Sequence, residues 1–276
     1  VKILFDRQEE FAFLSPRQCS RTRIVQGCDA EGKLTFRQVE VLLDNGAYTS
    51  WGATFPTVMM IPATSLYVVP NVRFSAELVY TNNTYCQAMR GYGNPEVTWA
   101  LESNLDELAE AAGMDAYDLR KINCNRPGEI TPMGLKVGTC GLQECLETTF
   151  SGLKWMEKRR QQRGKARGVG MASLMHVGGS GRIYRSDASG IILKFDDFGN
   201  INVSHGGVEM GQGLHSVIGL GIAEALGVRP EDVVMNQTDT GTCPWDVGTH
   251  ASRGAFTALN AAIDACNQAR ALIFEA

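Results

Sequence analysis

The 276-residue chain is predicted to form two α+β domains, each with a mixed sheet and flanking helices. Three observations predict this fold class. The length suits about two domains, because a domain commonly contains about 100–150 residues. Short β-type runs and long helical patterns both occur. Their arrangement changes near residue 168, where glycine-rich turns begin to separate the runs, so we expect domains over residues 1–156 and 157–276.

Short β-type runs fill much of residues 1–90. They are RTRIVQGCD, LTFRQVEVLLD and SLYVVPNVRFSAELVY, and EGK and DNG turns punctuate them. Short strands joined by tight turns are typical of hairpins. The pattern therefore predicts an antiparallel sheet.

Two helices are expected after the loop CQAMRGYGNPE. Apolar side chains recur at helical spacing over residues 97–112, with Asn94 as the expected N-cap and Gly113 as the C-terminal stop. A second, short helix is expected to begin at Asp115.

A loop over residues 125–142 and a helix over 142–163 complete the first half. The helix ends in a basic run, KRRQQRGKARG. Such a run suits either a nucleic-acid patch or a solvated helix end that links two domains. We favour the link and expect no nucleic-acid partner, because the chain carries 26 Lys and Arg against 30 Asp and Glu.

The second half alternates strands and helices. From residue 168 come β-type runs in GVGMASLMHVGG and GIILKFDDFGNINVSHGG, and the glycine-rich motif GGVEMGQGLHS follows. The remaining pattern predicts a helix (LHSVIGLGIAEALGV), a strand (VVMNQTDT), a loop and a final helix (AFTALNAAIDACNQARALIFEA).

Composition argues against several classes of protein. Gly, Pro or charge interrupts every apolar run before the roughly 20 residues that a membrane-spanning helix needs, and no signal peptide is recognisable. The eight cysteines form no CxxC pair, so we expect reduced, mostly buried thiols of a cytosolic protein and no metal site on them.

Two loop-to-helix junctions are candidate anion sites. GGVEMGQGLHS and GTHASRGAF each follow a strand and precede a helix. Glycine lets backbone approach a ligand, and the first N–H groups of a helix favour negative charge. A lone glycine cluster is more often a tight turn, and neither segment contains GxGxxG or the Walker lysine.

A third loop, AMRGYGNPE, presents Arg90 and Tyr92 before the helix at residue 94. Arg90 suits planar or oxyanion ligands, and the glycines around Tyr92 suggest an unusual backbone. The alternative is that Arg90 is an ordinary surface cation.

Taken together, the segments LFDRQEEF, AMRGYGNPE, SHGGVEMGQGLHS and THASRGAFTALNAA carry a resemblance. Their order and spacing resemble the large, molybdenum-cofactor-binding subunit of the xanthine dehydrogenase/aldehyde oxidase family, over essentially the whole chain. The resemblance implies two elongated molybdopterin-binding domains. Residues 1–156 would be the rear part of the first domain, and 157–276 the front part of the second.

The resemblance also implies residue roles. Arg90 would lie beside the molybdenum and Tyr92 beside the substrate, as catalytic residues. The residues implied to bind the cofactor are Arg90, Gly91, Met210, Gly211, Gln212, Gly213, Ala251 and Ser252. No metal ligand is expected from this chain.

Three neighbours of the cofactor loops are expected to be structural. His205 and His215 are expected to be buried structural histidines, and Glu209 to brace its loop.

The cofactor so implied is molybdopterin with molybdenum, in the cytosine dinucleotide form usual in bacterial relatives. The implied reaction is hydroxylation by water, with electrons leaving through iron–sulfur clusters and FAD on other domains or subunits of a cytoplasmic enzyme. The family's GGGFGGK-type segment and its glutamate base are absent from this sequence. The isolated chain, interpreted as an internal piece of a longer polypeptide, is therefore expected to be inactive.

The substrate class is narrowed by Val58 in FPTVMMIPA, a segment interpreted as a loop. Purine-oxidising members carry an arginine there, so Val58 argues against xanthine. RGYGNP lacks the cysteine of the carbon monoxide-oxidising branch. An aldehyde, an N-heterocycle or an aromatic thioester, as for 4-hydroxybenzoyl-CoA reductase, remains open. The competing interpretations are a non-enzymatic phosphate- or nucleotide-binding module and a scaffold without a ligand.

Overall fold

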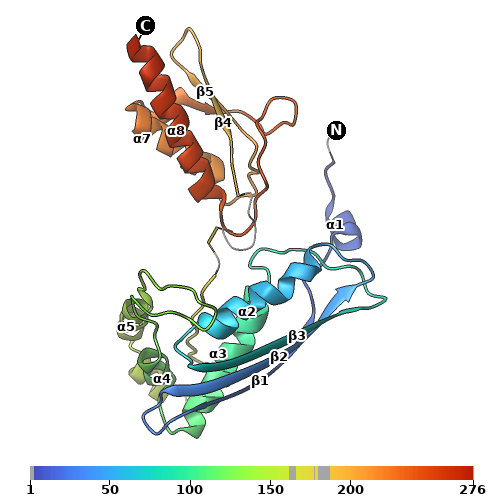
Figure 1. Cartoon of the computed structure of the whole chain (residues 1–276), viewed down its shortest axis with the longest axis vertical. Coiled ribbons are helices and arrows are strands. Elements are labelled where there is room, and N and C mark those ends of the chain that lie inside the picture. Colours follow the sequence, from blue (N-terminus) through green and yellow to red (C-terminus); the bar gives the residue numbers. More distant parts are fainter. Residues whose placement is uncertain (1–2, 162–165, 177, 180–186, 276) are drawn as a thin grey trace. The chain divides into compact units, whose positions relative to one another are not determined.

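The computed structural model describes residues 3–161, 166–176, 178–179 and 187–275. Its contacts divide the chain into two compact units, Val1–His176 and Val177–Ala276 (Figure 1). The first unit extends this far because residues 169–175 pack on it, and the Ser173 N–H donates to buried Glu102 at 2.8 Å. Compact units and sequence domains need not coincide, so the domain boundary expected at 156/157 stays a prediction.

The first unit contains a three-stranded sheet and several helices. Its elements are α1 (Arg7–Phe13), β1 (Ser20–Cys28), β2 (Leu34–Gly46), η1 (Trp51–Thr54), α2 (Phe55–Ser65), β3 (Asn71–Tyr80), α3 (Asn94–Ala111), α4 (Ala116–Ile122), α5 (Leu142–Gly152) and α6 (Trp155–Gln161).

The sheet has the order β1-β2-β3 and is mixed. β1 and β2 form an antiparallel hairpin, whereas β2 and β3 run parallel, so Val39 pairs with both Ile24 and Phe74. The expectation of an antiparallel sheet is therefore wrong. The reason is the crossover through η1 and α2, which returns the chain to the starting end of β2 before β3 begins.

Helix α2 lies where a loop was expected. Its FPTVMMIPATS sequence contains β-branched residues and two prolines, which hide the helical pattern. Phe55, Met59 and Ala63, spaced four residues apart, are fully buried against β2 and α3 in one core. Tertiary packing thus outweighs propensity here, and Val58 lies in a helix, 8% exposed, and not in a loop.

Helix α3 confirms the strongest helical pattern but begins differently. The N-cap is Gly93, with φ of 80°, and Asn94 is the first helical residue. The Asn94 amide instead contacts the Met175 carbonyl and accepts from the Thr98 hydroxyl at 2.6 Å. Gly113, with φ of 69°, follows the helix as predicted. Asp115 caps α4, also as predicted, by accepting the Tyr117 N–H at 2.8 Å.

The helix expected over residues 142–163 is interrupted. α5 ends at Gly152, Lys154 has φ of 51°, and α6 begins at Trp155. The interruption turns the Trp155 indole inward, where it is 1% exposed and donates to Asp115 at 2.9 Å. Residues 162–163 lie outside the described residues.

The second unit packs two helices on a small sheet. Its elements are β4 (Ile191–Phe195), β5 (Ile201–His205), α7 (Leu214–Leu226), η2 (Pro230–Asp232), β6 (Val233–Met235) and α8 (Gly254–Glu275). β5 is antiparallel to β4 and parallel to β6. Val203, Ile218 and Ala262 are fully buried in the core between sheet and helices.

Two strand predictions in the second half differ from the structure. No strand occurs among the described residues of the segment 168–179, and VVMNQTDT is extended only over β6. The β-type runs predicted in GIILKFDDFGNINVSHGG are present as β4 and β5, and both predicted helices are present. The fold class, α+β with mixed sheets, is confirmed.

All eight cysteines are free thiols, but only Cys86, Cys124 and Cys266 are buried, so the expectation that most are buried is wrong. Within the described residues, no helix has the length and apolarity that crossing a bilayer would require.

Candidate functional site

The Arg90 loop joins β3 to α3 through a backbone that only a glycine-rich sequence tolerates. Gly91, Tyr92 and Gly93 have successive φ angles of 98°, 21° and 80°. A Cβ at Gly93 would lie 3.2 Å from Met59 Cγ and 3.3 Å from the Met59 nitrogen. Gly93 thus lets the loop lie directly on α2, whereas a Cβ at Gly91 would lie 2.8 Å from Pro95 Cγ.

Tyr92 is fixed by the segment that begins α2. Its hydroxyl lies 2.9 Å from Thr54 Oγ1 and contacts the Trp51 carbonyl. Its ring packs edge-on against Phe55, with ring centroids 4.8 Å apart. An aromatic ring in such a geometry has a defined orientation, as a substrate-facing ring requires.

Arg90 itself is exposed, while its backbone is anchored. The Arg90 carbonyl accepts a hydrogen bond from Arg17 Nη2 at 2.6 Å, and Arg17 Nη1 pairs with Glu96 at 3.0 Å. Among the described residues, no carboxylate pairs with the Arg90 guanidinium. Arg17 is a site residue that the sequence reasoning missed, because no local pattern connects it to a loop 73 residues away.

The loop over residues 206–213 joins β5 to α7. A Cβ at Gly206 would lie 2.4 Å from the Pro244 carbonyl oxygen, so only glycine fits there. Gly211 and Gly213 have φ angles of 91° and 83°, and a Cβ at either would meet no described atom within 4 Å. Their need for glycine is conformational, and open space lies beside the loop.

Side chains of this loop bind its own backbone. Gln212 accepts the Met210 N–H at 2.5 Å through Oε1 and donates to the Val208 carbonyl at 2.8 Å through Nε2. Both bonds hold the Gln212 amide along the loop. Met210 projects outward and is 65% exposed.

Glu209 takes the position of an anion at the start of α7. Its carboxylate accepts the N–H groups of Gly211, Gly213 and His215 at 2.8, 3.0 and 3.1 Å. Hydrogen bonds from His215, Gly213 and Gly211 hold the pKa of Glu209 below its ordinary value. Glu209 therefore braces the loop, as predicted. The N–H groups of Gly211 and Gly213, expected to face a phosphate, donate to Glu209.

The loop over residues 246–253 leads into α8. Ala251 and Ser252 adopt φ angles of 48° and 52°, which are uncommon for residues with a side chain. Thr249 joins this loop to the first, because its Oγ1 accepts the Val208 N–H at 3.2 Å and donates to the Val208 carbonyl at 3.4 Å. The structure thus brings the two predicted cofactor loops of the second unit together.

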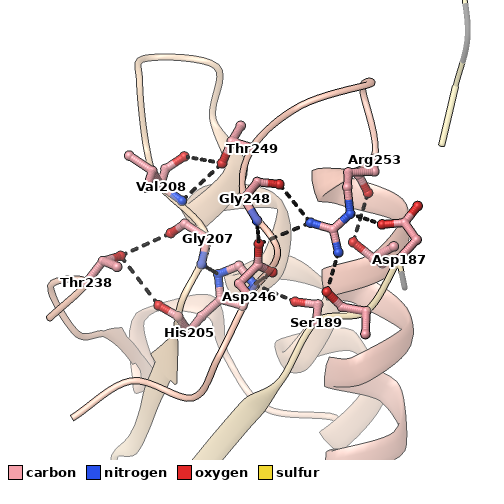
Figure 2. Close-up of polar contacts among 12 residues, drawn as sticks. Asp187, Ser189, His205, Gly207, Val208, Thr238, Asp246, Gly248, Thr249 and Arg253 are labelled. Atoms are coloured by element: carbon pink, nitrogen blue, oxygen red, sulfur yellow. Dashed lines mark hydrogen bonds and ion pairs between the residues drawn. The ribbon is translucent and has the colours of Figure 1, made fainter. Parts of the chain in front are cut away.

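A buried polar network lies beneath these loops (Figure 2). Arg253, 1% exposed, pairs with Asp187 and Asp246 and donates to the Gly248 and Ala188 carbonyls. Burial opposes ionisation of Asp246. Hydrogen bonds from the Gly248 N–H and the Ser189 hydroxyl, together with the Arg253 charge, outweigh burial and lower the Asp246 pKa.

His205 belongs to the same network. Its ring is 2% exposed and accepts the Gly207 N–H at Nδ1, 3.0 Å away, while Nε2 lies 2.9 Å from Ser189 Oγ. Burial lowers the pKa of His205. The prediction of a buried structural histidine is confirmed for His205, whereas His215 is only half-buried.

Arg90, Gly91 and Tyr92 lie in the first unit, and the other predicted site residues lie in the second. Two surface grooves of the second unit, of about 510 and 390 Å³, are formed largely by α7 and α8, and no predicted site residue lines them. Among the described residues, no group of three potential metal-ligating side chains occurs. The roles of the predicted residues toward a cofactor stay predictions.

Comparisons with known proteins identify the two halves of the chain. Two protein-family models, each described as a molybdopterin cofactor-binding domain, match this sequence over residues 1–124 and 147–276. The xanthine dehydrogenase molybdenum-binding subunit of Escherichia coli O157:H7 is 35% identical over 268 residues, covering 95% of this chain and 35% of the relative. A probable xanthine dehydrogenase subunit of Bacillus subtilis is 32% identical over 255 residues, covering 92% and 34%.

A solved structure shows the same fold. The aldehyde oxidoreductase from Desulfovibrio desulfuricans matches with a TM-score of 0.81 and 28% identity, covering 91% of this chain and 28% of that one. The chain thus spans about a third of the length of the curated relatives. From the paired domain matches and the shared fold, we conclude that this chain belongs to the xanthine dehydrogenase/aldehyde oxidase family and is built from molybdopterin cofactor-binding domains.

Proposed function

We propose that this chain forms part of a molybdenum hydroxylase and holds the pterin and phosphate of its cofactor with the two loops of the second unit. The observation that carries the proposal is the pair of hydrogen bonds between Val208 and Thr249, which fixes the two loops beside each other. Each loop is matched by the second cofactor-binding domain model. A phosphate can then contact both loops at once.

The residues present fit such a group. Open space beside Gly211 and Gly213 admits a ligand close to the backbone. Because Glu209 already takes the N–H groups of both glycines, the donors toward phosphate would be the second amide hydrogen of Gln212 and the Ser252 hydroxyl. The Ser252 hydroxyl has no hydrogen-bond partner among the described residues.

In the first unit, we assign Arg90 and Tyr92 to the reacting end of the cofactor. A guanidinium that pairs with no carboxylate of the described residues can stabilise an oxyanion, and the fixed Tyr92 ring can orient a planar substrate. When bound, the cofactor supplies oxygen transfer from water and takes up the two electrons that leave the substrate. The protein's contribution is position and charge.

The proposed substrate is a small molecule, either an aldehyde, an N-heterocycle or an aromatic CoA thioester. α2, the helix that carries Val58, contains no Arg or Lys, which argues against the arginine-bound purine of xanthine-oxidising members. The aldehyde class is also supported by similarity to an aldehyde oxidoreductase.

The proposed assembly includes further parts. Iron–sulfur clusters and FAD would be carried on other domains or subunits, and the pterin would be the cytosine dinucleotide form. We place the enzyme in the cytoplasm, and we expect the chain alone to be inactive, because it lacks the family's glutamate base.

The test is molybdenum and pterin content of the full-length polypeptide that contains this chain, purified from cells able to make the cofactor. We expect about one of each per polypeptide. Arg90→Ala should lower kcat by about 100-fold or more, as loss of an oxyanion donor does, and Arg90→Lys should recover part of the activity. Absence of both molybdenum and pterin would instead favour a non-enzymatic phosphate-binding module.

A further inference from the structure

His205 connects both cofactor loops through a buried chain of hydrogen bonds. The Gly207 N–H, at the start of the first loop, donates to Nδ1 at 3.0 Å. An imidazole nitrogen that accepts carries no proton, so the proton of the neutral ring lies on Nε2. Nε2 then donates to Ser189 Oγ at 2.9 Å.

The chain continues into the second loop. Arg253 donates to the carbonyl of Ala188, which precedes Ser189, and to Asp246 at 3.1 Å, whose carboxylate also accepts the Gly248 N–H at 2.8 Å (Figure 2). Asp246 and Arg253 flank the loop that carries Ala251 and Ser252. The buried network therefore links Gly207 of the first loop, through His205 and the segment 188–189, to Asp246 and Arg253 of the second.

Steric contacts make this arrangement specific. A Cβ at Gly207 would lie 2.2 Å from His205 Cε1, and one at Gly206 would lie 3.0 Å from Asp246 Cβ. On the other side, Thr238 Oγ1 donates to the Gly207 carbonyl at 3.0 Å. Gly207 therefore packs directly on the His205 ring, and no larger residue fits at that position.

We propose that His205 is a positioning residue that holds the two cofactor loops in register, through a neutral ring that accepts from Gly207 and donates to Ser189. This inference rests on the proposed function for its consequence, which is retention of the pterin. If a second proton bound to Nδ1, the Nδ1–H group and the Gly207 N–H would both be donors and could not hydrogen-bond to each other. The first loop would then lose its contact with His205. Acid should therefore loosen the cofactor.

The charged groups around His205 determine how readily its ring takes up a second proton. Asp246 Oδ2 lies 3.7 Å from Nε2 and favours the charged ring, whereas Arg253 and His215 disfavour it. Asp187 is paired with Arg253 and so offsets part of that charge. Within the described part of the chain, the hydrogen-bond partners of the ring, Gly207 and Ser189, are uncharged.

Two substitutions test separately the two hydrogen bonds of the His205 ring, with Gly207 and with Ser189, which together we call the relay. His205→Asn places an oxygen near the position of Nδ1 and keeps the acceptor for Gly207, but it cannot reach Ser189. His205→Gln reaches Ser189 with an amide N–H and loses the acceptor. Val203→Ala, two residues earlier on β5, is the control, because Val203 is fully buried in the hydrophobic core and has no side-chain part in the relay.

The first measurement is the rate of pterin release from the cofactor-loaded, full-length polypeptide between about pH 8 and pH 5, across the ordinary titration range of histidine. For the unmodified protein, release should accelerate on acidification. Both His205 variants should release pterin about three- to tenfold faster at high pH, as loss of one hydrogen bond implies, with a flatter pH profile. Val203→Ala should lower Tm and keep the original profile. Unchanged release and an unchanged pH profile in both His205 variants would overturn the proposal.

The second measurement separates this proposal from the proposed function. Nitrogen chemical shifts of ¹⁵N-histidine-labelled protein, assigned by comparison with His205→Gln, should show a neutral His205 with its proton on Nε2 at neutral pH. That result supports the relay even if the polypeptide carries no pterin. A proton on Nδ1, or a doubly protonated ring at neutral pH, would refute it.

Discussion

The carboxylate of Glu209 caps α7 from outside the helix, by accepting the N–H of Gly213 at 3.0 Å and that of His215 at 3.1 Å. Gly213 is the N-cap residue and has no side chain with which to cap. The Glu209 side chain takes the place of the missing N-cap side chain. It also stabilises the loop, by accepting the N–H of Gly211.

Glu209→Ala should therefore loosen the loop and the first turn of α7, because three N–H groups lose their acceptor. Amide hydrogen exchange should become faster at Gly211, Gly213 and His215, with little change in α8. Glu209→Gln, which keeps one acceptor oxygen, should show a smaller effect. Equal exchange in all three proteins would contradict the capping role.

Arg120→Met should destabilise the first unit by about 3–5 kcal/mol. This is the usual cost of leaving a buried charge, here the Glu102 carboxylate, without its ion-pair partner. Arg120 has a fully buried side chain and donates to Glu102 at 2.8 Å. Urea denaturation followed by circular dichroism measures the change.

The neighbouring Lys121→Met is the matched control on the same helix. Lys121 pairs with Glu147 at 2.9 Å, and both side chains are 40% or more exposed. Solvent screens such a pair, so no measurable loss is expected. A comparable loss in both variants would argue that α4 tolerates no substitution.

Gly206→Ala should destabilise the second unit by about 1–3 kcal/mol, as overpacking does, because the new Cβ would lie 2.4 Å from the Pro244 carbonyl oxygen. Gly219→Ala on α7 has the opposite expected sign, about 0.5–1 kcal/mol of stabilisation, since its Cβ would meet atoms only at 3.9 Å or beyond. Differential scanning calorimetry distinguishes the two. A stable Gly206→Ala protein would show that residues 244–246 move aside.

Stability should fall as the pH drops below about 6.5. Burial lowers the pKa of His176, His205 and His250 from the ordinary value of 6.5. The unfolded chain therefore binds more protons than the folded chain in this range, and acid favours unfolding. Tm measured between about pH 8 and pH 5 should decline on the acid side, and His205→Gln should decline less steeply.

A polypeptide ending at residue 176 should be more stable than one ending at 156. The shorter polypeptide lacks Ser173, whose N–H donates to Glu102, and Met175, which packs on the first core and whose carbonyl contacts Asn94. Limited proteolysis and Tm compare the two. Equal stability would mean that residues 169–176 contribute nothing to the first unit.

The sequence alone predicted the elements whose signals are local. α3, α7 and α8 follow from helical periodicity, and the strands β4 and β5 from β-type runs separated by a glycine-containing turn. The two candidate anion loops follow from glycine-rich segments between a strand and a helix, and their cofactor role was implied by the family resemblance. Gly211 and Gly213 do adopt positive φ angles, for which glycine is the residue of choice.

Tertiary structure alone decided the features that depend on distant residues. α2 forms because the core buries Phe55 and Met59, although its sequence resembles a loop, and β3 is parallel because α2 carries the chain back. The hydrogen bonds from Arg17 to the Arg90 loop and from His205 to Ser189 join segments with no pattern between them. Periodicity records which face of an element is buried, but only the folded chain determines which partner buries it.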